Sequence, residues 1–414
     1  MRRRVTLRII HVASRYLPAK LTGSDVYMRY ISEHLTLLGH DISVLTSDVC
    51  NNRALLVPFG GEFLACDAKI VNSVKVVRFK SYPCLPFFLA EKLLSKLDLR
   101  KNPIYDAIYN YSSGPITLGM YRFIINFSKK YDLIHATAFP HTPFYMAFKA
   151  SQKTGIPFVC TPAFHFDVPS FYNLFLIDLM RQSDAVIAAT AIEKRKIVEL
   201  GVKSNRIYVV PKGVEPKEWA KASGKRFREK HGIKDAPIIL FAGAKNEGKG
   251  IFQVLRSMNY VQNKTKDAVL VTIGETNVKW ENEKRKCNVR LLDLPYLPDY
   301  EKMDAFDACD IFVLPSRVDS FGIVYLEAWM CGKPVIGARV GSTPDVIRDG
   351  VDGLLVNLGD AEDLATKILS LLNEPHLRQT MGTAGKERTL KYFTWQKVAE
   401  QIDEIYLNVT NRRG

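Results

Sequence analysis

Two acidic residues stand out in the segment LPSRVDSFGIVYLEAWMCGKPVIGA, residues 314–338. The apolar pattern predicts a strand, a loop that contains Asp319, and a helix that contains Glu327. A carboxylate inside such a helix can accept hydrogen bonds from paired hydroxyls, as acidic residues do for the ribose of a nucleotide. The alternative for these residues is an N-cap aspartate followed by a solvated glutamate.

The backbone between the two acidic residues can also bind a ligand. N–H groups at the start of a helix lie at its positive end and bind anions or sugar hydroxyls. We therefore expect Asp319 to act together with the residues that open the helix, which are Ser320, Phe321, Gly322 and Ile323.

A glycine-rich loop predicts a phosphate site in the segment FAGAKNEGKGIFQVL, residues 241–255. The loop follows a strand and precedes a helix, so its amides and the ammonium groups of Lys245 and Lys249 can hold a diphosphate. The spacing from Gly243 to Lys249 is nearly that of a P-loop, but Gly250 stands where a P-loop needs a hydroxyl to hold magnesium. A P-loop NTPase and a turn with solvated lysines are the alternatives.

A histidine among aromatic residues is the main candidate of the N-terminal half. His165 follows a strand and a proline turn in GIPFVCTPAFHFDVPSF, residues 155–171, and can donate to a bound hydroxyl or phosphate. His11 and His135 are weaker candidates of the same kind. The alternative is a satisfied core or loop histidine. Gly23 follows the first strand and lets the backbone approach a ligand, unless it is only a turn residue.

Several motifs with specific chemistry do not occur in the sequence. No D-x-D pair is present to hold a metal ion on a diphosphate, so metal dependence is not expected. The sequence also lacks a G-x-S-x-G elbow, an H-E-x-x-H motif and a G-x-G-x-x-G after the first strand. Hydrolase, metalloprotease and dehydrogenase functions therefore lose most of their support. Seven cysteines without a C-x-x-C pair predict neither a zinc site nor a disulfide framework.

The candidate residues fall on the loops of a repeating strand, loop and helix pattern. Apolar β-rich runs recur from RIIHVA at residue 8 to GLLV at residue 353, and most are separated by helical-period stretches such as 25–38, which ends at Gly39. We expect two doubly wound parallel sheets with a cleft between the carboxyl ends of their strands. Prolines, glycines and charged residues near 212–235 predict the boundary between them.

Charge is unevenly distributed along the chain. The 414 residues carry a net charge of +15, and residues 1–211 hold 27 basic against 15 acidic residues. Such a field favours a polyanion or an anionic lipid surface. Nucleic acid is not expected, because no arginine-rich tract, RNA-stacking motif or zinc finger accompanies the charge. The basic start is interpreted as a first strand and no apolar run reaches the roughly 18 residues of a membrane span, so we expect a cytoplasmic protein.

The motif PSRVDSFGIVYLEAWMCGKPVIG resembles the signature of the retaining glycosyltransferases of family 4. Weaker motifs agree with it in order. The family's first strand, glycine loop and helix resemble RIIHVASRYLP, LTGSD and LLGHDISVLTSD. Its later strands resemble DLIHAT, PFVCTPAFH, DAVIAAT and IYVVPKGVE, and its closing helix resembles YFTWQKVAEQIDEIYLNV. The resemblance implies a GT-B fold. It assigns residues 1–211 plus 394–414 to an acceptor-binding domain and residues 212–393 to a nucleotide-sugar-binding domain, both Rossmann-like.

The resemblance also implies roles for single residues. The donor would be a UDP- or GDP-sugar acting as co-substrate, without a further cofactor. Glu327 would bind the ribose, and Asp319 with the amides that follow it would hold the hydroxyls of the donor sugar. Lys249 would neutralise the diphosphate, and His165 would match the histidine near the sugar and phosphate.

Three positions depart from the family pattern. Asp319 stands where the family usually has glutamate. Ala244 occupies the place of the usual phosphate-binding arginine, so Lys245 is predicted to substitute for it. The first loop holds Gly23 alone where the family has a pair of glycines.

The predicted acceptor is a glycan or a lipid-linked molecule in the synthesis of a glycan, glycolipid or cell-envelope polysaccharide. Residues 83–131 interleave apolar and aromatic residues with lysine and arginine. This pattern is typical of a helix that rests peripherally on a membrane, and equally of core-facing helices with lysine edges. An epimerase of GT-B fold and a non-catalytic nucleotide or nucleic-acid binding protein are the alternative functions.

Overall fold

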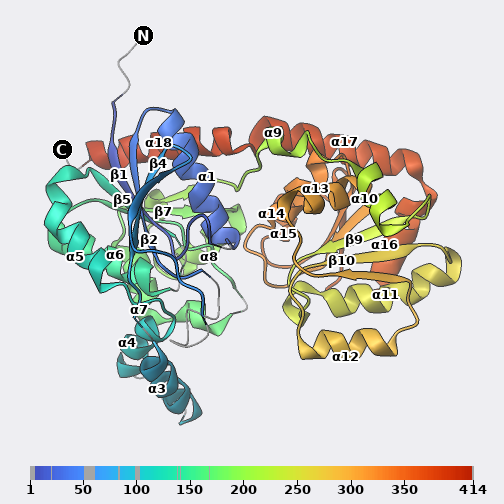
Figure 1. Cartoon of the computed structure of the whole chain (residues 1–414), viewed down its shortest axis with the longest axis horizontal. Coiled ribbons are helices and arrows are strands. Elements are labelled where there is room, and N and C mark those ends of the chain that lie inside the picture. The colour runs from blue at the N-terminus through green and yellow to red at the C-terminus, as the bar shows by residue number, and fades with distance from the viewer. Residues whose placement is uncertain are drawn as a thin grey trace. The chain divides into compact units, whose positions relative to one another are not determined.

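The computed structural model describes residues 5–19, 21–50, 61–82, 84–97, 103–137, 139, 141–166 and 168–412. The chain divides into two compact units, Met1–Pro211 with Trp395–Gly414 and Lys212–Thr394 (Figure 1). Each unit is built on one sheet of parallel or mainly parallel strands that are connected through helices. The predicted fold class, two parallel α/β sheets, is confirmed.

The first unit contains an eight-stranded sheet in the order β3-β4-β2-β1-β5-β6-β7-β8. Its paired strands are parallel except for the antiparallel pair β3 and β4. The central strand β1 buries Ile9, Ile10 and Val12 completely, as a strand covered on both faces requires. The strands are β1 (Arg8–Val12), β2 (Asp41–Ser47), β3 (Ala68–Val71), β4 (Val74–Phe79), β5 (Leu133–Ala136), β6 (Phe158–Cys160), β7 (Ala185–Ala188) and β8 (Ile207–Val209).

Helix α1 (Gly23–Leu37) begins where its sequence provides a cap. The Asp25 carboxylate accepts hydrogen bonds from the backbone N–H and the hydroxyl of Thr22 at 3.1 and 2.9 Å, so the helix begins two residues before the predicted start. Gly39 follows the helix with a φ of 97°, which glycine adopts without strain. The other helices of this unit are α3 (Leu85–Lys96), α4 (Pro103–Ser112), α5 (Leu118–Phe127), α6 (Thr142–Thr154), α7 (Leu174–Gln182), α8 (Ala191–Glu199) and α18 (Trp395–Asn411), with short 3-10 turns η1 (Ser128–Lys130), η2 (Pro169–Tyr172) and η3 (Ser204–Arg206).

The last helix, α18, packs against α1 in the first unit. Trp395 is buried and stacks on Tyr30, with ring centres 5.2 Å apart. The hydroxyl of Tyr406 lies between His11 and His135, so the end of the chain contacts two strands of the sheet.

The second unit contains a six-stranded parallel sheet in the order β11-β10-β9-β12-β13-β14. Its strands are β9 (Ile238–Ala242), β10 (Val269–Ile273), β11 (Leu291–Leu294), β12 (Ile311–Leu314), β13 (Val335–Ala338) and β14 (Gly353–Val356). Its helices are α9 (Pro216–Trp219), α10 (Gly224–His231), α11 (Ile251–Lys264), α12 (Val278–Lys286), α13 (Asp299–Ala308), α14 (Ile323–Met330), α15 (Thr343–Val346), α16 (Ala361–Asn373) and α17 (Pro375–Tyr392), with a 3-10 turn η4 (Glu247–Lys249).

Two loops of the second unit are neighbours because of this strand order. β9 pairs with β12 in parallel, so the loops that follow them leave the same edge of the sheet. The first loop contains Lys249 and the second contains Asp319. Ligands of open α/β sheets bind at such carboxyl ends.

Candidate functional site

The loops after β9 and β12 are joined by hydrogen bonds and by close backbone packing. The carbonyl of Gly248 accepts from the hydroxyl of Ser316 at 3.1 Å and from the N–H of Arg317 at 2.9 Å. Gly250 has a φ of +78°, and a Cβ added there would lie 2.3 Å from the carbonyl oxygen of Pro315. This position therefore has no room for the serine or threonine of a P-loop, which weakens the NTPase alternative.

Lys249 and Asp319 are brought into contact by these loops. The Lys249 ammonium lies 2.7 Å from Asp319 Oδ1, and only 24% and 14% of the two side chains are exposed. Asn246 Oδ1 accepts a hydrogen bond from the backbone N–H of Lys249 at 3.0 Å and fixes the turn that carries the lysine. The pair places a cation, which can bind phosphate, next to a carboxylate, which can accept hydrogen bonds from hydroxyls.

Helix α14 begins beside this pair. Gly322 caps the helix with a φ of 83°, and Ile323 is its first residue. The Tyr325 hydroxyl donates to the carbonyl of Leu314 at 2.7 Å and ties the first turn of the helix to the end of β12. Ser320 and Phe321 precede the cap. The predicted backbone donors therefore lie at the positive end of the helix.

Glu327 lies just over one turn into α14 and is held by a lysine of α13. Its Oε1 lies 2.9 Å from the ammonium of Lys302. Burial alone would lower the pKa of Lys302, but the Glu327 carboxylate outweighs it, so that pKa is raised. Within the described residues the buried Oε2 of Glu327 has no hydrogen-bond partner. Such an oxygen is costly to bury, and a ligand hydroxyl would satisfy it.

Lys245 differs from its predicted role as a phosphate ligand. Its side chain is fully buried, and the ammonium lies 2.6 Å from both Asp293 Oδ1 and the carbonyl of Leu294. Burial lowers the pKa of Lys245. The lysine therefore fastens its loop to the end of β11, and its contacts do not fit a phosphate role.

Asp293 is the centre of this buried cluster. It accepts hydrogen bonds from Lys245, Thr272, Trp280 and Lys284 at distances of 2.6 to 3.1 Å. Burial opposes its ionisation, but the donors, Lys245 first among them, outweigh burial and lower its pKa to about 2. The aspartate thus stays charged and holds Lys245 in place.

Sequence reasoning did not identify Asp293 and Lys302. A weak signal exists for Asp293, which is an acidic residue inside the apolar strand LLDL, where charged residues are rare unless they are paired. Lys302 gives no such signal, because a lysine on a helix is usually solvated. Its contact with Glu327 joins helices α13 and α14, which only the fold brings together.

The remaining candidates belong to the first unit and are described within it. His165 is half-buried with its ring edge-on to Phe171, 5.0 Å between centres. Gly23 opens α1 and has open space where a Cβ would stand. His11 and His135, in contrast, are fully buried in the contact with Tyr406, which fits the alternative of satisfied core histidines. Roles for His165 and Gly23 stay predictions.

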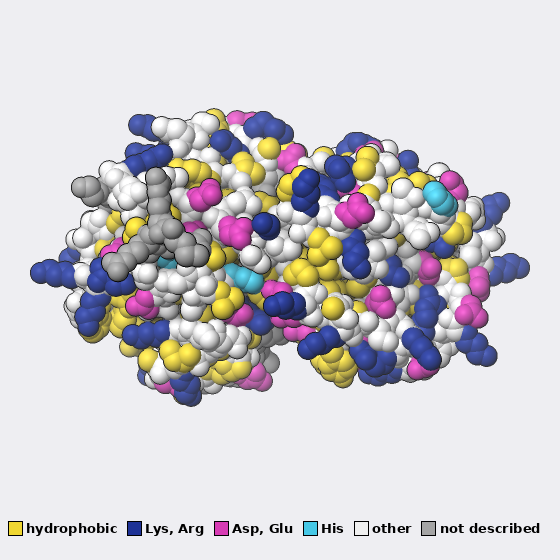
Figure 2. Space-filling model, turned by 90° about the horizontal axis from the view of Figure 1, so that it is seen from above, with side chains coloured by type: hydrophobic (Ala, Val, Ile, Leu, Met, Phe, Trp, Pro, Cys, Tyr) yellow, Lys and Arg dark blue, Asp and Glu magenta, His cyan; other side chains and the backbone are white. Residues whose placement is uncertain are grey.

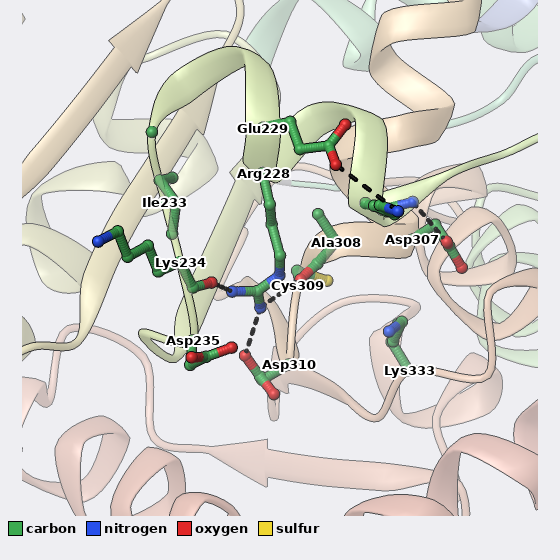
Figure 3. A pocket seen from close by; sticks show the side chains of 13 residues that line it. Arg228, Glu229, Ile233, Lys234, Asp235, Asp307, Ala308, Cys309, Asp310 and Lys333 are labelled. Carbon is green, nitrogen blue, oxygen red and sulfur yellow. Dashed lines mark hydrogen bonds and ion pairs between the residues drawn. The ribbon is translucent and has the colours of Figure 1, made fainter.

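A pocket of about 680 Å³ lies elsewhere in the second unit (Figure 3). It is lined by α10, the end of α13 and the approach to β9 and β12, and thus lies at the opposite ends of the strands from Lys249. Arg228 crosses it and donates to the carbonyls of Lys234 and Ala308 at 2.8 Å and to Asp310 at 3.2 Å. None of the predicted ligand-binding residues lines this pocket.

Charged side chains are mixed on the face shown in Figure 2. Lysine and arginine occur on each unit there, with aspartate and glutamate between them. A nucleic-acid surface usually carries a continuous basic stripe. On this face basic and acidic side chains are interspersed instead, and the expectation that the protein does not bind nucleic acid stays a prediction.

The chain is similar in sequence to named glycosyltransferases. The chain is 27% identical to the sulfoquinovosyl transferase of Arabidopsis thaliana over 313 residues, which cover 70% of this chain and 60% of that protein. It is 32% identical to the D-inositol 3-phosphate glycosyltransferase of Xylanimonas cellulosilytica over 244 residues, 56% of this chain and 58% of that protein. The chain thus spans about three fifths of the length of these relatives.

Solved structures share the fold of the whole chain. Anabaena HepE in complex with UDP and glucose matches with a TM-score of 0.74 at 16% identity, over 97% of this chain and 100% of that chain. Sucrose-phosphate synthase from Thermosynechococcus elongatus matches with a TM-score of 0.74 at 18% identity, over 98% and 100%. This likeness shows the GT-B-like fold.

Two family profiles match the chain in succession. Residues 21–218 match the family described as Glycosyltransferase Family 4. Residues 224–388, which contain the loops of Lys249 and Asp319 and the helix of Glu327, match the Glycosyl transferases group 1. The predicted resemblance is confirmed, and the chain belongs to the group 1 glycosyltransferases of family 4.

Proposed function

We propose that this protein is a retaining glycosyltransferase that moves a sugar from a nucleoside diphosphate sugar to an acceptor hydroxyl. The observation that supports this most is the buried Oε2 of Glu327, which needs a hydrogen-bond donor and lies on the helix that follows the Asp319 loop, where Asp319 pairs with Lys249 of the neighbouring loop. A ribose hydroxyl supplies that donor, and Lys249 supplies the charge for the diphosphate. UDP is the first base to test, because HepE was crystallised with UDP and UDP-glucose.

The proposed reaction follows from charge. When the bond between the sugar C1 and the diphosphate oxygen breaks, its electron pair goes to the diphosphate and positive charge builds on the sugar. Lys249 and the N–H groups at the start of α14 stabilise the leaving group. Asp319 exchanges its contact with Lys249 for a hydroxyl of the donor sugar. The acceptor oxygen bonds to C1 on the face of the leaving group, and its proton passes to the diphosphate, so configuration is retained.

In this proposal the acceptor is a glycan or a lipid-linked molecule. A relative that supports a lipid is the GDP-mannose-dependent alpha-(1-6)-phosphatidylinositol monomannoside mannosyltransferase of Mycolicibacterium smegmatis, 27% identical over 47% of this chain and 55% of that protein. His165 assists the transfer, and Gly23 lets the backbone approach the substrate. Donor binding is independent of metal, because the sequence provides no D-x-D pair.

Thermal denaturation with a panel of nucleotides tests the donor site. UDP, GDP, ADP and ATP are each added with magnesium and with a chelator. We expect one nucleoside diphosphate to stabilise the protein in chelator, by about 2.7 kcal/mol at 100 times its dissociation constant. Stabilisation by ATP alone, and only with magnesium, would contradict the proposal.

The Glu327→Gln variant tests the ribose contact. The neutral amide keeps the size of the side chain but loses the charge-assisted hydrogen bond, so we expect the affinity for the stabilising nucleotide to fall about tenfold or more. Glu283→Gln is the matched control, because Glu283 pairs with Lys286 on the surface of α12. Analysis of the reaction products separates transfer from epimerisation: a transferase releases the nucleoside diphosphate, whereas an epimerase returns a second nucleotide-sugar.

A further inference from the structure

Helix α3 turns an apolar stripe towards solvent. Leu89, Leu93 and Leu97, at its C-cap, are spaced by four residues and are 58%, 59% and 59% exposed. Because residues four apart share one face of a helix, the three leucines form a continuous row. The helix has no fully buried residue. For α3, this exposure does not fit the alternative of a core-facing helix with lysine edges.

Charges on α3 are segregated by sign. The exposed residues Lys92 and Lys96 lie on the same side as the leucines. The acidic residue of the helix, Glu91, instead accepts a hydrogen bond from the Tyr105 hydroxyl of α4 at 2.8 Å. The outward face of α3 therefore combines apolar and cationic side chains, while its negative charge is directed towards the protein.

The pair α3 and α4 stands at one end of the first unit (Figure 1). Helix α3 packs against α4, and α4 in turn packs against α6 and α7. Ile104, at the start of α4, is 62% exposed. The leucine row is thus carried on a projecting helix that the rest of the described unit leaves accessible.

We propose that the outward face of α3 docks onto an anionic lipid bilayer. An apolar row bordered only by lysines is the composition of helices that lie in the membrane interface, where leucines enter the acyl boundary and lysines meet anionic headgroups. In the described part of the chain no helix is long and apolar enough to cross a membrane. Within residues 1–211, basic residues outnumber acidic ones, and this net positive charge adds long-range attraction to the anionic bilayer.

This inference deepens the proposed function. Docking through the first unit brings the predicted acceptor-binding half to a bilayer. The acceptor class that this favours is a lipid-linked molecule whose headgroup carries the hydroxyl. A bilayer fits this leucine row better than a protein partner does, because an anionic bilayer requires only apolar and cationic groups on the docking face and no shaped groove.

Flotation of the full-length protein with vesicles tests the docking. Phosphatidylcholine vesicles are compared with vesicles that contain about one third phosphatidylglycerol. We expect binding to the anionic vesicles, weakened by high salt, and little binding to the neutral ones. Leu89→Ser/Leu93→Ser should reduce binding at least about tenfold, and Lys92→Glu/Lys96→Glu at least about fivefold.

Matched controls locate the effect. Leu37→Ser changes a leucine of α1 that is 78% exposed, and Lys153→Glu/Lys203→Glu changes two exposed lysines of the same unit; both should bind vesicles like the wild type. Nucleotide affinity is measured for every variant and should not change, so failure of docking and failure of the donor site are separate results. Equal vesicle binding by Leu89→Ser/Leu93→Ser, no binding by the wild type, or self-association through Leu89 without lipid would overturn the proposal.

Discussion

Lys245 and Lys249 lie four positions apart in one loop, yet their surroundings give them different chemistry. Lys249 keeps a partly exposed ammonium beside Asp319, where a ligand can compete for it. Lys245 is fully buried against Asp293 and the carbonyl of Leu294. A buried lysine that already satisfies two oxygens acts on the site through the backbone that it positions.

Replacing each lysine by methionine should separate the two roles. Lys249→Met removes a charge-assisted hydrogen bond of about 1.5 to 3 kcal/mol, so the affinity for the nucleoside diphosphate should fall about 10- to 100-fold with little change in stability. Lys245→Met removes the main hydrogen-bond partner of the Asp293 carboxylate inside the protein, so the free energy of unfolding should fall by about 2 to 3 kcal/mol. Isothermal titration and urea denaturation measure the two quantities.

Lys279→Met is the control for both variants. Lys279 is exposed and pairs with Glu247 on the surface, and such pairs contribute little. A loss of nucleotide affinity in Lys245→Met that matches Lys249→Met, at unchanged stability, would contradict the positioning role of Lys245.

At the scale of elements, the site depends on how closely two loops approach. The 3-10 turn η4 and helix α11 meet at Gly250, whose φ of +78° and contact with Pro315 exclude a side chain. The same contact holds Lys249 next to the loop of Asp319. The shape of this loop is therefore set by its neighbour on β12 as much as by its own residues.

Gly250→Ala should disturb binding more than stability alone explains. The added Cβ must push the two loops apart, so we expect a loss of nucleotide affinity of at least about tenfold together with a lower melting temperature. Gly232→Ala is the matched control, because Gly232 has a φ of +64° at the end of α10 and open space around its Cβ position. That variant should lose about 1 kcal/mol of stability and keep its affinity. Equal nucleotide affinities of the two variants would show that the contact between the loops does not support nucleotide binding.

At the scale of the whole molecule, the end of the chain completes a buried hydrogen-bond chain in the first unit. The Ser32 hydroxyl donates to the carbonyl of Met28 at 2.6 Å, so it accepts from His11 Nδ1 at 2.7 Å. His11 Nε2 then accepts from the Tyr406 hydroxyl at 3.0 Å, whose oxygen accepts from His135 Nδ1. These directions follow because burial lowers the pKa of His11 and keeps its ring neutral at neutral pH, so that only one of its two nitrogens donates.

Acid should destabilise this arrangement. Burial, with a smaller effect of His40, lowers the pKa of His11 from 6.5 to about 3 in the folded protein. Between these values the unfolded chain binds a proton that the folded chain does not, so stability is full above pH 6.5 and falls as the pH drops towards 3. The expected slope reaches about 1.4 kcal/mol per pH unit from this group. Urea denaturation at a series of pH values measures it.

The variant Tyr406→Phe tests the same series of buried hydrogen bonds at neutral pH. It removes the hydroxyl between His11 and His135 and leaves two buried ring nitrogens without that partner, so we expect a loss of about 2 to 4 kcal/mol. Tyr392→Phe is the control, since Tyr392 is half-exposed and should change stability by less than about 0.5 kcal/mol. Equal stability of the two variants would show that the hydroxyl does not support the fold.

Much of the fold and part of the site follow from local sequence. Apolar runs predict thirteen of the strands, because a strand buried on both faces must be apolar. They do not indicate β3, an edge strand whose residues are largely exposed. The proximity of Lys249 and Asp319 could be anticipated, since each follows a strand of the same sheet, and parallel strands end at one edge.

The sequence by itself determined the two α/β sheets and the glycine-rich loops that follow their strands, and it predicted Asp319, Glu327 and Lys249 as candidate site residues, because each of these depends on spacing within a short segment. Tertiary structure alone decided that Lys245 is buried on Asp293, 48 residues away, that Lys302 holds Glu327 from 25 residues away, and that Tyr406 joins His11 across 395 residues. Burial and pairing decide what a charged or polar group can do, and both depend on neighbours that are distant along the chain and are brought close only by folding.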